Sequence, residues 1–236
     1  MMATEKQARI CQVGAICAFV AGFCYVLMII CAFLSPVSIA SYVTSEQYFI
    51  DFKGYRYIFI FLKFLMIVAN SAFIGVVLAF QSLVRDKNYG LVLFVSALAF
   101  VGFSVGIFQS VVDLSRVPYL ATQYEMGSEN IKDVIIALGV ANPFIYIISL
   151  GFPGLWLILV SVLALNNPMI PRLLAILGFM WGFGNILTVI AHVFVIMWLV
   201  YLVAFGGLLA APFWSLWEGV FLWRISQKKQ DVFNLS

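Results

Sequence analysis

Five stretches of the sequence are predominantly apolar over 22 residues or more, and this feature most limits what the chain can fold into. They cover residues 13–34, 57–80, 91–112, 134–165 and 173–225. A helix of about 20 apolar residues is long enough to cross the hydrocarbon of a bilayer. A water-soluble fold is excluded, because 64% of the residues are hydrophobic and only 10% are charged, against about 25% charged in a soluble domain.

The last stretch is 53 residues long, which is too long for one membrane helix and suits two helices joined by a tight hairpin near residues 197–204. The fourth contains Pro143 and Pro153, which favour a kink, so we predict one bent span with an interfacial lead-in. The sequence thus predicts an all-α, polytopic transmembrane bundle in a single domain, residues 1–236. Its six spans are predicted at about 13–34, 57–80, 91–112, 134–165, 173–196 and 204–225.

The positive charges orient this bundle. An even number of spans places both termini on one side, and short cytoplasmic loops are enriched in Lys and Arg. Eight cations fall on the side of the termini: Lys6, Arg9, Arg85, Lys87, Arg172, Arg224, Lys228 and Lys229. Four fall on the other side: Lys53, Arg56, Arg116 and Lys132. Both termini are therefore predicted to be cytoplasmic, with longer loops outside around residues 35–56 and 113–133.

Eight polar side chains on four predicted spans are the candidate ligand-binding residues. Ionisable groups in a bilayer are costly unless paired or hydrated, which makes them candidates for function. The eight are Lys63, Asn70, Gln109, Asp113, Arg116, Asn142, Asn185 and His192. Within a span they recur three, four or seven residues apart, which places them on one helix face. Most lie toward the outer half, which favours a polar cavity that opens outward.

A structural reading of the same residues stays open. The polar side chains could bond to one another as ties between helices, and Lys63 could extend its stem to the outer headgroups. Glu218 lies near the inner end of the last span, six residues before Arg224. We interpret it as an anchor at the inner boundary, with proton transport as the alternative.

The sequence shows no catalytic or metal-binding constellation. It has no glycine-rich phosphate loop, no G-x-S-x-G and no H-E-x-x-H motif. His192 is the single histidine, which excludes a bis-histidine haem within the chain. The four cysteines are interpreted as small apolar packing residues: Cys11, Cys17, Cys24 and Cys31. No cofactor or metal is expected, and an enzymatic role is disfavoured.

Packing is predicted from rows of small residues, which let membrane helices approach closely. Such rows occur in four spans and include Gly14, Gly102, Gly182 and Gly219. The tryptophans near the end of the last span, Trp214 among them, suit the interfacial aromatic belt.

The segment Pro171-Arg172-Leu173-Leu174-Ala175-Ile176-Leu177-Gly178 follows a short polar turn and opens a span. It resembles a segment of an uncharacterised bacterial family of six-helix membrane proteins, the domain of unknown function 4386, and the loop lengths are similar across most of the chain. The resemblance implies a six-helix fold in a bacterial plasma (inner) membrane. It implies no activity and no binding residues.

Three functional hypotheses follow. The first is a non-enzymatic bundle that binds a small molecule or lipid, or an accessory subunit of a membrane complex. The second is a small transporter or channel with a polar outward-facing cavity; a lipid-modifying enzyme using Lys63, Asp113 and His192 is a third, less favoured reading. The expected partners are membrane lipids, a small-molecule or lipid ligand, and another membrane protein or a second copy of the chain. A nucleic acid is not expected, since the net charge is only +3.

Overall fold

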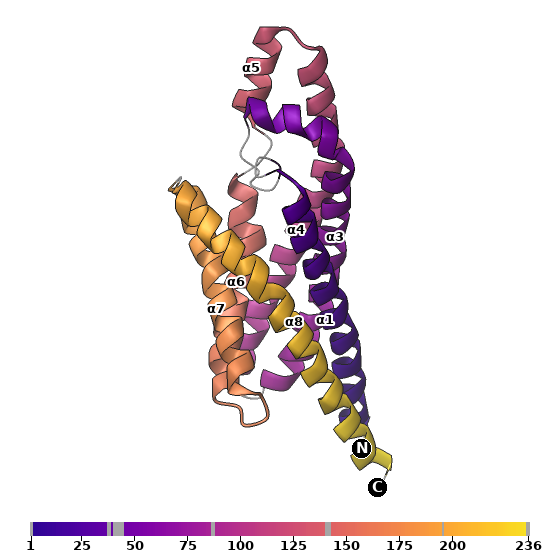
Figure 1. Ribbon diagram of the computed structural model, residues 1–236. Helices are drawn as coiled ribbons and strands as arrows, with labels where there is room; N and C mark the ends of the chain where they lie inside the picture. Colours follow the sequence, from indigo (N-terminus) through magenta and orange to yellow (C-terminus); the bar gives the residue numbers. More distant parts are fainter. Residues whose placement is uncertain are drawn as a thin grey trace.

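The computed structural model describes residues 2–36, 39, 45–85, 88–139, 143–194 and 196–234. In these residues the chain is built from α-helices, which confirms the predicted fold class. The helices, labelled as in Figure 1, are α1 (Met2–Leu34), α3 (Glu46–Val84), α4 (Tyr89–Met126), α5 (Glu129–Leu138), α6 (Pro143–Leu165), α7 (Arg172–Val193) and α8 (Met197–Asn234).

Six long helices form a closed ring. Following the contacts between helices, α1 packs against α3, α3 against α4, α4 against α6, α6 against α7, α7 against α8, and α8 against α1. Five of them are long and apolar enough to cross a membrane, namely α1, α3, α4, α6 and α7. The sixth, α8, is 38 residues long and lies along α1 (Figure 1). The chain is thus an integral membrane protein with about six spans.

The beginning of α1 and the end of α8 lie together at one end of the bundle (Figure 1). An even number of crossings requires this arrangement. We refer to this end as the inner end, following the charge distribution. That it faces the cytoplasm remains a prediction.

In their described residues, both regions predicted as long outer loops are largely helical. The side chain of Ser45 caps α3 by accepting a hydrogen bond from the backbone N–H of Tyr48 at 3.2 Å, so α3 begins well before its apolar span. Helices of 39 and 38 residues would be nearly twice as long as the roughly 30 Å hydrocarbon layer at about 1.5 Å per residue. The excess of α3 and α4 extends past the outer ends of the shorter helices (Figure 1).

A small second core holds this outer extension together. The rings of Phe49 on α3 and Tyr124 on α4 stack with their centres 4.6 Å apart, and Ile135 of α5 is buried in the same cluster. Lys132 on α5 pairs with Glu129 at 2.9 Å, and the hydrogen bond to that carboxylate raises the pKa of Lys132. Apolar packing, with ion pairs around it, therefore orders the segment outside the membrane.

The region predicted as one bent span at 134–165 is two helices. Helix α5 ends at Leu138, because Gly139 adopts a φ of 70° that L-residues with a side chain rarely tolerate. Helix α6 begins afresh at Pro143, so this proline starts a helix and does not kink one. The last hairpin also differs from the prediction. Since α7 ends at Val193 and α8 begins at Met197, the turn precedes residues 197–204.

Aromatic side chains fill the centre of the ring. Each of the six long helices contributes one: Tyr25, Phe73, Phe103, Trp156, Trp181 and Trp214. Ring centres of contacting pairs lie 5.1 to 6.4 Å apart, the range in which aromatic pairs attract. Trp214 is only 2% exposed, so its assignment to the interfacial belt was wrong. The reason is that its face of α8 points to the ring centre and not to the headgroups.

Small residues allow the backbones to meet where the ring is tightest. At Gly182, an added Cβ would lie 2.7 Å from the carbonyl oxygen of Gly154 on the neighbouring helix. At Gly14, it would lie 2.1 Å from the Cβ of Ala79. These contacts agree with the close approach predicted for the rows that contain Gly14 and Gly182. The space beside Gly207 is open.

Candidate functional site

Three of the predicted site residues meet at the outer end of the membrane-crossing region. Lys63 on α3 donates to Oδ2 of Asp113 on α4 at 2.6 Å. Gln109, one turn before Asp113 on α4, donates to its other oxygen, Oδ1, at 2.5 Å. Lys63 also lies over the ring of Phe59, 5.6 Å from its centre. The spacing in the sequence had placed Gln109 and Asp113 on one face, and the fold adds the cation opposite them.

This cluster is closed and not open to a ligand from outside. The side chains of Lys63 and Asp113 are each only 3% exposed, and both carboxylate oxygens accept a hydrogen bond from within the protein. An ion pair with this geometry holds two helices together, because separating the partners would leave a buried charge. Lys63 therefore does not extend its stem to the headgroups. The geometry favours the structural reading of these residues.

Arg116 contacts a neighbouring segment. Its guanidinium donates to the backbone oxygen of Gly139 at 3.2 Å, so it fastens the end of α5 against α4. Asn70 lies against Gly106, since a Cβ added to that glycine would be 3.0 Å from the Asn70 side-chain nitrogen. Neither contact joins the cluster of Lys63 and Asp113.

For the two predicted residues on α7, the contacts found in the described part of the chain lie away from that cluster. His192 uses Nδ1 to bond the backbone oxygen of Thr188 on its own helix at 2.8 Å. Asn185 packs beside Gly154, where α6 and α7 touch. Asn142 lies outside the described residues. Asp113 accepts hydrogen bonds from Lys63 and Gln109, and among the described residues no hydrogen bond joins it to His192.

The four cysteines are not joined in disulfide bonds. Among the described residues, no three His, Cys, Asp or Glu side chains gather in a way that could hold a metal ion. Cys11, Cys24 and Cys31 are buried in the apolar cores. Their packing agrees with the interpretation as small apolar residues.

A groove at the inner end, between α1 and α3, was not predicted from the spacing of polar residues. It has a volume of about 490 Å³. Its polar lining consists of Lys6, Arg9, Gln81, Ser82, Arg85 and Tyr89, and its apolar lining of Ile10, Val13, Gly75 and Leu78. The cations had been noted only as orientation signals. The spacing in the sequence could have revealed part of the groove, because residues 6, 9, 10 and 13 lie on one face of a helix.

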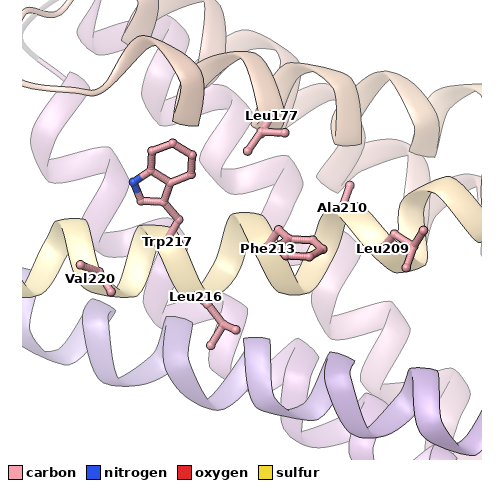
Figure 2. A pocket seen from close by; sticks show the side chains of 7 residues that line it. All are labelled: Leu177, Leu209, Ala210, Phe213, Leu216, Trp217 and Val220. Carbon is pink, nitrogen blue, oxygen red and sulfur yellow. The ribbon is translucent and has the colours of Figure 1, made fainter.

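A second groove lies between α7 and α8 and has a volume of about 640 Å³. Figure 2 shows Leu177 projecting from α7 toward α8, with Phe213, Ala210 and Leu209 along α8 opposite it. The remaining lining residues are Leu216, Trp217 and Val220. Phe213 is 68% exposed. Its described lining residues are all uncharged, so this groove suits hydrocarbon in general and offers no charge with which to select a ligand.

Glu218 is also placed differently from its prediction. It is fully buried at 0% exposure, whereas an anchor at the boundary would reach the headgroups. Arg224, its suggested neighbour, is exposed. Neither oxygen of Glu218 has a hydrogen-bond partner among the described residues.

A model of a protein family, described as "Domain of unknown function (DUF4386)", matches residues 20–223, well over half of the chain. The match agrees with the resemblance seen in the segment at 171–178. No curated protein and no solved structure matches the chain.

Proposed function

Since the chain belongs to the DUF4386 family, whose function is unknown, we propose from its own residues that it is a non-enzymatic membrane bundle that binds an anionic phospholipid. The site is the inner groove between α1 and α3. In a bacterial plasma membrane, where we place the protein, this groove would face the cytoplasmic leaflet. The observation that carries the proposal is the combination of three cations with an apolar floor in one groove.

The two parts of the groove match the two parts of a phospholipid. Lys6, Arg9 and Arg85 line its inner end, where we propose that the headgroup phosphate binds. Val13 and Leu78 lie one or two turns deeper on their helices and offer contact to an acyl chain. Basic pockets between membrane helices on the cytoplasmic side are a recurrent form of site for anionic lipid headgroups.

A transporter or channel has less support. The aromatic side chains from all six long helices pack against one another at the centre of the ring, where a conduction path would need polar or hydrated surface. The outer polar residues meet in a closed ion pair between Lys63 and Asp113. We assign that pair to holding α3 against α4.

Binding of lipid to purified protein tests the proposal. Native mass spectrometry in mild detergent should detect phosphatidylglycerol bound in preference to phosphatidylcholine. The variant K6Q/R9Q/R85Q should lose most of this preference. Each cation near a membrane surface contributes about 1 kcal/mol, so three together predict roughly a hundredfold loss of affinity.

A matched control separates the groove from the general charge of the inner end. The variant R172Q/R224Q/K228Q removes three exposed cations at the same end, outside the groove. It should bind phosphatidylglycerol like the wild type. Equal loss in both variants, or no preference for the anionic lipid in the wild type, would refute the proposed site. If glycerol phosphate competes with the lipid, the phosphate group is sufficient for binding and the acyl chains are not required.

A further inference from the structure

The buried carboxyl group of Glu218 is not explained by lipid binding. Glu218 is 0% exposed and lies on α8, seven residues before Ile225. At about 1.5 Å per residue it is roughly 10 Å deeper than that residue, which places it well inside the bundle. Acidic side chains at such depth are rare, and most serve a function or pair with a cation.

Glu218 is enclosed by contacts between helices. The adjacent residue, Gly219, lies against the ring of Phe19 on α1, since an added Cβ would be 2.8 Å from that ring. One turn further along α8, Leu222 contacts the position of Gly14 on α1, which itself meets Ala79 of α3. The carboxyl group is therefore held within the bundle and does not face the surrounding lipid.

Other polar atoms without a hydrogen-bond partner occur in the same part of the bundle. Ser215 precedes Glu218 by three residues, so the two share a helix face, and its hydroxyl has no partner among the described residues. The indole N–H of Trp156 has none there either. Trp156 contacts Trp214, one turn before Glu218, with ring centres 6.4 Å apart. Buried polar atoms in proteins are nearly always satisfied, so such a group points to a bound proton or water.

The helices packed around α8 offer Glu218 no charged partner at this depth, and Arg224 on α8 itself is exposed. The sequence of α7 has no ionisable side chain between Arg172 and His192, and that of α3 has none between Lys63 and Arg85. On α4 none occurs between Tyr89 and Asp113, and α6 carries only Tyr146. The titratable groups within the span of α1 are its four cysteines and Tyr25. An ionised Glu218 would thus be a buried charge without a counter-ion.

We infer that Glu218 is a proton-binding site inside the bundle, with its carboxyl group neutral when the helices are packed as described. Release of the proton creates a carboxylate that needs hydrogen-bond donors, and the hydroxyl of Ser215 and the indole of Trp156 are the unused donors in this region. Water that enters the bundle would connect these groups. Proton release is therefore expected to loosen the packing of α8.

Infrared spectroscopy of protein labelled with ¹³C-glutamate tests the protonation state directly. The chain has five glutamates, and Glu218 is buried, whereas Glu46, Glu125 and Glu129 are exposed. At neutral pH we expect a carbonyl band of a protonated carboxyl group that shifts with the label. The band should vanish in E218Q and persist in E129Q, which changes a glutamate that is 85% exposed. A wild-type spectrum with glutamate carboxylate bands alone would overturn the inference, and that result does not require any variant to fold.

Thermal unfolding across a pH series gives a second measurement. Because the neutral acid tolerates burial and the ionised one does not, the wild type should lose stability as the pH rises, and E218Q should not show this loss. Identical pH profiles for the wild type and E218Q would contradict the inference. Neither measurement involves lipid, so failure here leaves the proposed lipid site unaffected.

Discussion

The ion pair of Lys63 and Asp113 allows a quantitative test of how α3 and α4 are joined. In K63M the carboxylate of Asp113 keeps one hydrogen bond, from Gln109, and loses its counter-ion. In D113N the ammonium group of Lys63 loses its acceptor, while Gln109 can still donate to the amide oxygen. Because both side chains are 3% exposed, each single change leaves a buried charge and should cost about 3 to 5 kcal/mol.

The double variant K63M/D113N removes both charges together. Replacing a buried ion pair by neutral groups is often nearly neutral for stability, so we expect recovery to within about 1 kcal/mol of the wild type. Thermal unfolding in detergent is the assay. For a chain of this size, about 1 kcal/mol shifts the midpoint by roughly 2 to 4 °C, so each single variant should unfold roughly 6 to 20 °C earlier.

The pair of Lys53 and Glu125 is the matched control, because it also joins α3 to α4 but its side chains are 76% and 58% exposed. K53Q should lower the unfolding midpoint far less than K63M or D113N, because water screens an exposed pair. If K63M and D113N lower the unfolding midpoint as little as K53Q does, water must reach Asp113 and the pair is not buried in the membrane-crossing region. A double variant that is less stable than either single variant would equally refute it.

Three further substitutions test the packing, each by thermal unfolding. G182A should destabilise the bundle by about 1 to 3 kcal/mol, because its methyl group would meet the α6 backbone. The control G207A, whose methyl group would lie in open space, should be neutral or slightly stabilising. Equal changes in the unfolding midpoint would contradict the close approach of α6 and α7 at Gly182. W214A should cost about 3 to 5 kcal/mol of stability, because it leaves a cavity. W198A should cost much less, since Trp198 is 68% exposed. If W198A were the more destabilising, Trp214 would not lie in the ring centre. G139A should cost about 1 to 2 kcal/mol because of its φ of 70°, and an unchanged midpoint would refute the strained position.

The inner groove and the position of Glu218 show why single-helix patterns give only part of a site. Periodicity places Lys6 and Arg9 on one face of α1, but it cannot show that Arg85 of α3 lines the same groove. Likewise, distance along the sequence suggested that Glu218 lies near the boundary beside Arg224. The direction in which each side chain points depends on how α8 is rotated against its neighbours, and only contacts between helices fix that rotation.

The sequence by itself determined the membrane location, the all-helical class and the approximate number of spans, because hydrocarbon forces each crossing segment to satisfy its own backbone hydrogen bonds. It also placed Gln109 and Asp113 on one face, since helical spacing is a local property. Only the tertiary structure decided that Lys63 lies opposite Asp113, that Trp214 lies in the ring centre, and that α3 and α4 continue outside the membrane. These features depend on contacts between residues far apart in the chain, and apolar residues that face lipid look the same in the sequence as those that face another helix.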